Sequence, residues 1–399
     1  MRVSLSRKEE EAHMRNKESI WRKPMVVVLA LVMALAVFAV GCGDDDDEGS
    51  SGGGNASTQS SDNGGGEAKQ IALLLPESKT TRYESQDRPL FTAKLKSECP
   101  NCELIYSNAD QDASKQQQQA EAAITKGADV LVLDPVDAAS AASIVTRAKQ
   151  SKIPVISYDR LIQKAPVDYY ISFDNEKVGK LQGEALVKAL GSPQGKSIVM
   201  INGAPTDSNA AMFKKGAHSV LDSSGVDIAK EYDTPDWSPD KAQSQMEQAI
   251  TAVGKNKIDG VYAANAGTGG GAIAAMKSAG IDPTKVPVTG QDAELAGVQR
   301  IIAGEQYMTI YKAPKPETEA AAKLAVALAR GEDAPAGLIN GESDNGSGSP
   351  IKSVLLDPVA VTKENIKDTV VKDGTYSVDE LCTKQYADAC KAIGLTEAR

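Results

Sequence analysis

Short apolar runs alternate with helix-patterned segments along most of this 399-residue chain. Helical patterns such as residues 114–126, 138–149, 176–190 and 241–253 separate the runs. Strands are predicted at residues 71–75, 104–107, 130–133, 155–158, 170–173, 198–201, 226–231, 260–263, 286–289, 308–311 and 354–356. A strand and helix repeating over roughly 25–35 residues is typical of βαβ units, and hence of parallel sheets with helices on both faces.

We therefore expect an α/β fold. A single sheet of all these strands would be unusually large, so the pattern favours two Rossmann-like lobes of five or six strands each. No short repeat of the solenoid type interrupts the alternation.

The N-terminal region has the pattern of an export signal. A basic stretch precedes an uninterrupted apolar run at residues 25–40, which is shorter than the roughly 20 residues that span a bilayer. Small residues then lead into Cys42 and resemble a bacterial lipobox. We expect residues 1–41 to be a signal peptide and Cys42 to be the lipidated first residue. An uncleaved signal anchor is the alternative, and translation can start at Met1 or Met14.

The segment from residue 42 to residue 68 has the composition of a tether. An acidic run is followed by residues that are almost all Gly, Ser, Asn and Thr, which cannot form a core. The folded part is expected to begin near residue 69. This arrangement predicts an extracytoplasmic body anchored to the cell membrane by an N-terminal lipid.

Charge and histidine content exclude several classes of function. The chain has 44 basic and 54 acidic side chains, a formal net charge of −10, which argues against a nucleic-acid partner. Beyond the signal, His218 is the only histidine, and it lies in a helix-like stretch. A Ser-His-Asp triad or a histidine zinc site is therefore not supported, and we interpret His218 as a surface or packing residue. No metal or cofactor is predicted.

Four cysteines remain beyond Cys42, and an exported protein can form disulfides. They allow three pairings, of which we favour the local one, Cys99 with Cys102 and Cys382 with Cys390. A redox role for Cys99 and Cys102 is the alternative, but the motif does not open a helix that would lower a thiol pKa. A zinc site formed by all four is less favoured.

Polar side chains follow six of the predicted strands where each strand ends. In an open α/β sheet, ligands bind beyond the carboxyl ends of the strands. Mixed donors and acceptors there suit a polyol better than an anion or a metal. Helix N-capping is the alternative for single residues, and it fits Asp174, Asp207 and Asp292. The residues at the six ends include Asp159, Arg160, Asp174, Asn175, Asp207, Asn209, Asn265, Asp292 and Lys312.

These stretches resemble the periplasmic sugar-binding proteins of ABC importers, type I, and within that family the members that bind D-xylose. The similarity covers about residues 69–375. Two blocks are Ile156-Ser-Tyr-Asp-Arg-Leu-Ile162 and Gly290-Gln-Asp-Ala-Glu-Leu-Ala-Gly297, and the others are residues 168–179, 269–273, 302–312 and 365–374.

The resemblance implies two lobes joined by three crossing segments, with a sugar in the cleft between them. Crossings are expected near Asn175, near Lys312 and after Pro350. The N-terminal lobe would then comprise residues 69–175 and about 313–350. The C-terminal lobe would comprise residues 176–312 and about 351–375, leaving residues 376–399 as an extension with a disulfide.

The resemblance also implies a set of sugar contacts. Aspartates would accept from hydroxyls, basic side chains would donate to ring and hydroxyl oxygens, and the indole would face apolar C–H groups. Xylose-binding members have tryptophan where this chain has Tyr83, and members of the family often have an Asn-Asp pair where Asn265 precedes Ala266 in this chain. The implied contacts are Arg82, Tyr83, Asp159, Arg160, Asp207, Asn209, Trp237, Asn265, Asp292 and Lys312.

The implied function is capture of a monosaccharide, D-xylose in preference, for delivery to the permease subunits of an ABC importer by a monomeric protein. A broad-specificity aldose-binding protein (glucose, galactose or arabinose) for transport or chemosensing is the alternative. A glycoside hydrolase using two aspartates is less favoured. A nucleotide site at the glycine run 267–272 is disfavoured because this run follows the eighth predicted strand and not the first. A sugar-responsive repressor is disfavoured because an export signal lies where an N-terminal helix-turn-helix would be needed.

Overall fold

The structure, a computed structural model, describes residues 68–396. The expected signal peptide, Cys42 and almost all of the expected tether lie outside this range. Among the described residues, no helix is long and apolar enough to cross a membrane.

The first lobe is built on a seven-stranded sheet of order β10-β11-β5-β4-β3-β1-β2, in which only β10 runs antiparallel to its neighbour. The bounds of these strands are β1 Gln70–Leu75, β2 Glu103–Asn108, β3 Val130–Leu133, β4 Val155–Tyr158, β5 Tyr169–Phe173, β10 Gly341–Ser343 and β11 Ile351–Leu356.

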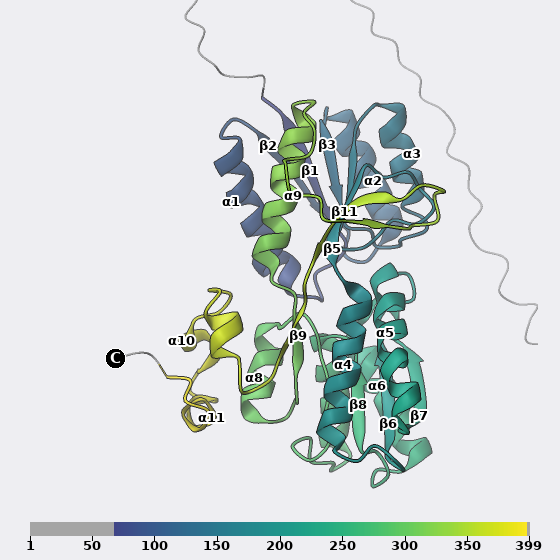
Figure 1. The fold of residues 1–399 in the computed structure, drawn as a ribbon, viewed down its shortest axis with the longest axis vertical. Helices are drawn as coiled ribbons and strands as arrows, with labels where there is room; N and C mark the ends of the chain where they lie inside the picture. Colours follow the sequence, from purple (N-terminus) through teal and green to yellow (C-terminus); the bar gives the residue numbers. More distant parts are fainter. Residues whose placement is uncertain (1–67, 397–399) are drawn as a thin grey trace, which may run out of the picture. The chain divides into compact units, whose positions relative to one another are not determined.

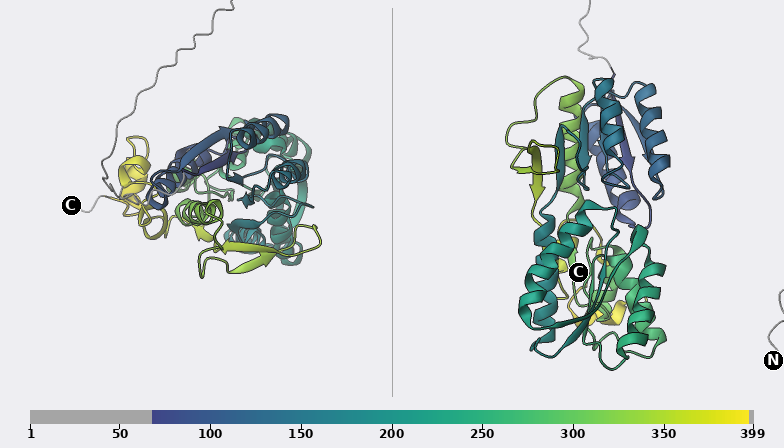
Figure 2. Two further views of the ribbon diagram at one scale, coloured as in Figure 1. Left: turned by 90° about the horizontal axis from the view of Figure 1, so that it is seen from above. Right: turned by 90° about the vertical axis from the view of Figure 1, so that its right-hand side faces the viewer.

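Helices cover both faces of this sheet (Figures 1 and 2). Strand β1 is buried on both sides: Ile71 and Leu73 pack in one hydrophobic cluster, and Ala72 and Leu74 in another. The first cluster includes side chains of α1 and α9, and the second side chains of α2 and α3. These helices are α1 Arg88–Glu98, α2 Ala113–Thr125, α3 Ala142–Gln150 and α9 Pro314–Ala329, with the short π-helix η1 Tyr83–Asp87 before α1.

The second lobe has a parallel sheet of order β7-β6-β8 and an antiparallel pair, β9 and β12. Single bridges, Val261 with Val288 and Gln291 with Ile310, connect β8 through an extended segment to β9. The bounds are β6 Ser197–Asn202, β7 Asp227–Asp233, β8 Gly260–Ala263, β9 Thr309–Tyr311 and β12 Val359–Val361.

Four helices pack on the two faces of β6 and β8, and a fifth, α8, shares a core with a C-terminal group of short helices. The helices are α4 Asn175–Leu190, α5 Ser208–Ser224, α6 Pro239–Val253, α7 Ala266–Ser278 and α8 Leu295–Ala303, with the 3₁₀-helix η2 Pro235–Trp237. The C-terminal group is η3 Lys367–Val371, α10 Val378–Leu381 and α11 Ala387–Ala392.

Two sequence expectations about strands are wrong. Residues 286–289 form no regular strand: Pro287 lacks an N–H, and the Thr289 hydroxyl bonds the backbone of Ala263 in place of a ladder bond. Strand β11 was expected in the C-terminal lobe, but it pairs with β5 in the first-lobe sheet. The third crossing therefore comes after Leu356 rather than after Pro350.

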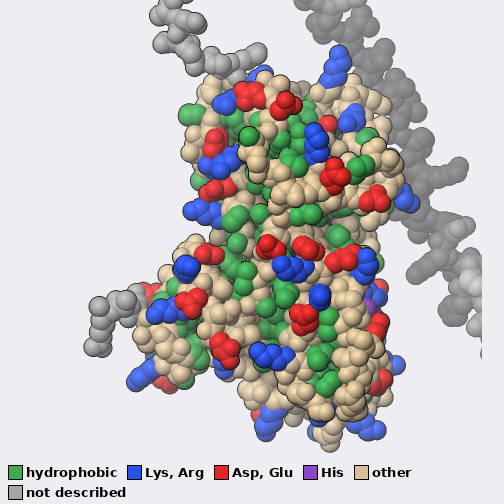
Figure 3. All heavy atoms as spheres, viewed as in Figure 1, with side chains coloured by type: hydrophobic (Ala, Val, Ile, Leu, Met, Phe, Trp, Pro, Cys, Tyr) green, Lys and Arg blue, Asp and Glu red, His purple; other side chains and the backbone are tan. Residues whose placement is uncertain are grey.

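Both local cysteine pairs are disulfides in the structure, Cys99 with Cys102 and Cys382 with Cys390. The second lies in the C-terminal group of helices, whose apolar side chains share a core with α8. On the face shown in Figure 3, acidic and basic side chains are interspersed over the described surface.

Candidate functional site

The predicted contact residues converge between the two lobes around a small cavity whose lining side chains are buried. Nine of the ten predicted residues line it, and the tenth, Arg82, lies directly behind it in contact with Asp159 and Asp292. The lining is Thr80, Tyr83, Asp159, Arg160, Asp207, Asn209, Phe213, Trp237, Asn265, Gln291, Asp292 and Lys312.

The first lobe supplies Asp159 and Arg160 from the loop after β4. Asp159 adopts a positive φ of 54°, a conformation that costs energy for a residue with a side chain and is common at functional sites. Its carboxylate accepts a hydrogen bond of 2.8 Å from the Tyr83 hydroxyl and lies 3.3 Å from Lys312 Nζ. This turn therefore directs a carboxylate and a guanidinium to the same opening.

Opposite charges outweigh burial at Asp159. Burial alone would raise its pKa, but Lys312, Arg82 and Arg160 hold that pKa below its usual value. Burial acts on Lys312 in the opposite sense, and Asp159 and Asp292 raise its pKa above the usual value. The pair is therefore ionised at neutral pH and offers both a charged acceptor and a charged donor.

Arg82 is fixed from behind by two further carboxylates. Its Nη2 lies 3.1 Å from Asp87 Oδ1 and 3.3 Å from Glu317 Oε2, and all three side chains are buried. Its Nη1 has no hydrogen-bond partner among the described residues and lies 3.6 Å from Asp292 Oδ1. Asp87 and Glu317 therefore support the site, and sequence reasoning missed both because they lie outside the strand ends.

The second lobe supplies its residues from helix starts. Asp207 caps α5 by accepting from the Asn209 N–H, and Asn265 caps α7 by accepting from the Thr268 N–H. Capping and facing the cavity are thus compatible roles. Asp174 caps α4 at the Lys177 N–H but does not line the cavity. Asp292 caps no helix: the N-cap of α8 is Glu294.

Trp237 forms one wall of the cavity. It is buried, its Nε1 donates to Asp207 Oδ2 at 3.0 Å, and its ring packs edge-on to Phe213. A Cβ placed on Gly203 would lie 2.0 Å from the indole, so the close approach of this ring depends on the glycine. Phe213 also lines the cavity but is not among the predicted contacts, although it lies one helical turn after Asn209.

Several bonds cross between the lobes at the cavity. Arg160 Nε lies 2.9 Å from Asp207 Oδ2, and Asn209 Nδ2 donates to the backbone oxygen of Asp159 at 3.1 Å. Beside them, the Leu161 N–H donates to the Ser208 hydroxyl at 2.9 Å. In this structure the two lobes are therefore in contact, in a closed arrangement.

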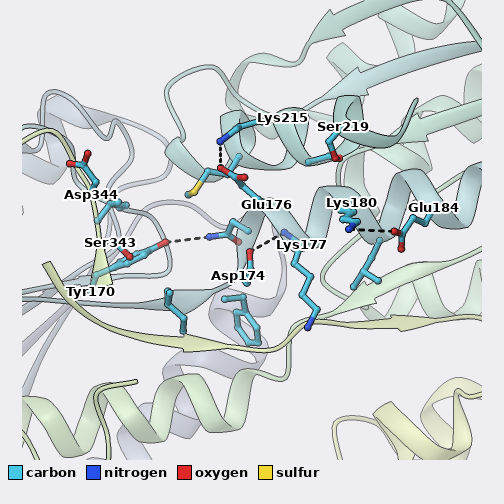
Figure 4. Close-up of a pocket in the computed structure, with 17 residues that line it drawn as sticks. Tyr170, Asp174, Glu176, Lys177, Lys180, Glu184, Lys215, Ser219, Ser343 and Asp344 are labelled. Atoms are coloured by element: carbon cyan, nitrogen blue, oxygen red, sulfur yellow. Dashed lines mark hydrogen bonds and ion pairs between the residues drawn. The ribbon is translucent and has the colours of Figure 1, made fainter. Parts of the chain in front are cut away.

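A larger groove lies nearby on the surface (Figure 4). Its volume is about 830 Å³, and it opens to solvent. Several of its charged side chains pair with one another, as Glu176 does with Lys215 and Lys180 with Glu184. The buried cavity instead gathers convergent polar groups from both lobes, so it is the better candidate for a ligand site.

The remaining candidates have structural roles in the described chain. His218 lies on the surface of α5 between Asp222 and Glu231. The glycine run lies inside α7, where a Cβ on Gly271 would come within 2.2 Å of the Pro239 carbonyl oxygen of α6. Within residues 68–396, no group of three or more His, Cys, Asp or Glu is arranged to hold a metal ion.

The family model for the periplasmic binding protein domain matches residues 71–333. The chain belongs to the periplasmic binding protein family. This family assignment, together with a cavity that gathers donors and acceptors from both lobes, argues against the glycoside hydrolase alternative. Two lobes with parallel sheets and a cavity between them are the arrangement that the family resemblance implied.

Known members of the periplasmic binding protein family resemble the chain over most of its length. It is 40% identical to the D-xylose-binding periplasmic protein of Escherichia coli over 318 residues, 78% of this chain and 92% of that protein. It is 37% identical to a multiple sugar-binding periplasmic receptor of Rhizobium radiobacter, over 68% of this chain and 81% of the receptor. A carbohydrate transporter solute-binding protein of Chloroflexus aurantiacus in complex with D-glucose superposes with a TM-score of 0.71 at 28% identity, covering 78% and 98% of the two chains.

Proposed function

We propose that this protein captures a monosaccharide, D-xylose in preference, and delivers it to an ABC importer. The observation that carries the proposal is the buried cavity in which both lobes place charged donors and acceptors around the Trp237 indole. Charged hydrogen bonds of about 1.5–3 kcal/mol each would supply the roughly 8 kcal/mol of micromolar binding from a few net contacts.

The preference for D-xylose is supported by the identity with relatives named as D-xylose-binding proteins. A broad-specificity aldose-binding protein, for transport or chemosensing, is the second candidate. It is favoured by the multiple sugar-binding relatives and by the fold shared with a D-glucose complex. The two candidates differ in how sharply the cavity discriminates among aldoses.

Calorimetric titration of the protein with D-xylose, L-arabinose, D-glucose and D-galactose tests the proposal. We expect saturable 1:1 binding of D-xylose with the lowest Kd of the four sugars. Similar Kd values for several aldoses would favour the second candidate, and binding of none would contradict both. Lys312→Met should abolish most of the binding, while Lys315→Met, on the exposed side of α9, is the matched control.

The proposed cellular setting follows from the N-terminal sequence. Cys42 would carry the lipid, and the chain would work as an extracytoplasmic monomer whose partners are the permease subunits of the importer.

A further inference from the structure

Glu294 joins the two lobes outside the cavity. It belongs to the second-lobe loop that leads into α8, and its Oε1 accepts a hydrogen bond of 2.7 Å from the backbone N–H of Thr81 in the first lobe. Its side chain is buried, with 6% of the residue exposed, and it does not line the cavity. This hydrogen bond exists only while the lobes are in contact.

The charges around Glu294 are mainly of its own sign. Asp292 and Glu77 both act on it as neighbouring carboxylates, one from each lobe, and Glu294 in turn acts electrostatically on Tyr376. Arg300 is a basic group that interacts electrostatically with Glu294, but its guanidinium donates to Gln306 Oε1 and to the Ala266 carbonyl. Within residues 68–396, no ion pair within 4.0 Å involves Glu294.

We propose that Glu294 is a latch that helps to hold the lobes closed and takes up a proton when they close on a sugar. The inference rests on the proposed function, because it assumes that binding closes the lobes. Hinge closure around a ligand is the movement that two-lobed binding proteins make. Separation of Thr81 from Glu294 would remove the hydrogen-bond donor and admit water to the carboxylate.

In the closed arrangement, the electrostatic environment favours the protonated form of Glu294. Burial, and then the neighbouring Asp292, raise the pKa of Glu294 to about 7, although the Thr81 hydrogen bond lowers it. In the open arrangement a hydrated glutamate titrates near 4.3. A protonated carboxyl keeps its carbonyl oxygen, so it still accepts the Thr81 N–H. The closed form therefore binds more protons than the open form between these two pKa values.

Linkage then fixes the sign of the pH effect. Because closure takes up a proton, the affinity for sugar must rise as the pH falls from about 8 towards 5. With pKa values of about 7 and about 4.3 in the two arrangements, the Kd should be on the order of tenfold lower at pH 5.5 than at pH 7. Uptake should approach one proton near pH 6.

The test is calorimetric titration with D-xylose at several pH values between 5 and 8, which gives the Kd at each pH. At pH 6 the titration is repeated in two buffers of different ionisation enthalpy, which gives the number of protons taken up. The wild type should show the tighter binding at acid pH and the uptake of close to one proton. Glu294→Gln keeps an acceptor for Thr81 but cannot titrate, so its Kd should vary less with pH than that of the wild type, and its proton uptake at pH 6 should be smaller by close to one proton. Glu294→Ala, which also removes the acceptor, should bind more weakly at every pH.

Glu332→Gln is the matched control, since Glu332 is exposed beyond the end of α9 and should retain the wild-type pH dependence. A Kd for D-xylose that does not change with pH, or a Glu294→Gln variant with the wild-type proton uptake, would overturn the latch while leaving sugar binding intact. Failure to bind any aldose at any pH would overturn the proposed function and the latch together.

Discussion

Arg160 of the first lobe and Asp207 of the second form a buried ion pair, with 2.9 Å between Nε and Oδ2. The same carboxylate oxygen accepts the hydrogen bond from the Trp237 indole. Burial raises the pKa of Asp207, and Arg160 only partly offsets this effect. Groups that face the cavity thus also hold the lobes together, so their substitution should weaken both closure and binding.

Replacement of Asp292 by alanine should weaken sugar binding. Asp292 Oδ1 lies 3.3 Å from Lys312 Nζ and has no hydrogen-bond partner among the described residues, so it is free to accept from a hydroxyl. We expect a loss of about 1–3 kcal/mol, up to roughly a hundredfold in Kd, and similar losses for Asp159→Ala and Asn209→Ala. Calorimetry with D-xylose measures it, and an unchanged Kd in Asp292→Ala would remove that residue from the site.

Trp237 should report binding through its fluorescence. In a Trp21→Phe background it is the only tryptophan, and sugar entry with lobe closure would replace water around the indole. The emission should change saturably with D-xylose and stay flat with a sugar that calorimetry shows not to bind. If the ring stacks on the sugar, Trp237→Ala should lose roughly 1–3 kcal/mol of binding. Calorimetric binding without any change in emission would place Trp237 outside the site.

The substitution Gly203→Ala should damage the site through Trp237. The added methyl would lie 2.0 Å from the indole, and relief of that overlap must displace the ring and its bond to Asp207. Such overpacking costs about 1–3 kcal/mol, and we expect lower affinity for D-xylose and a lower Tm. Gly267→Ala is the control, because its methyl would make only ordinary contacts of 3.4 Å or more. Equal behaviour of the two variants would contradict this role of Gly203.

His218 should make a small pH-dependent contribution to stability. Burial alone would lower its pKa, but hydrogen bonds to Asp222 and Glu231 raise it above the usual value. The contribution is therefore complete below about pH 6.5 and is lost as the pH rises through the raised pKa. The Tm difference between wild type and His218→Gln should shrink from pH 5.5 to pH 8.5. Parallel Tm curves would show that the contacts do not favour the charged ring.

Membrane attachment should depend on Cys42. If this residue carries the lipid, Cys42→Ser should move the protein from the membrane fraction to the soluble fraction when cells are fractionated. Cys99→Ser in the otherwise wild-type protein is a control for the loss of a cysteine other than Cys42. Retention of Cys42→Ser in the membrane fraction would favour the uncleaved anchor.

The α/β class and most of the candidate site can be predicted from the order of the amino acids. Short continuous apolar runs indicate strands that are buried on both faces of a sheet. Strands β3, β4 and β8 begin and end where these runs predict. Polar residues at strand ends identified Asp159, Arg160 and their partners, because parallel strands bring their carboxyl ends to one edge.

Which distant residues meet depends on how the helices and strands pack in three dimensions. Lys312 reaches Asp159 across 153 positions, Glu294 reaches Thr81 across 213, and β11 joins the first-lobe sheet rather than the second. Local patterns carry hydrophobic periodicity and capping, which depend on neighbours a few residues away. The supporting carboxylates Asp87 and Glu317 acquire their role only when packing places them around Arg82, and no local signal marks that contact.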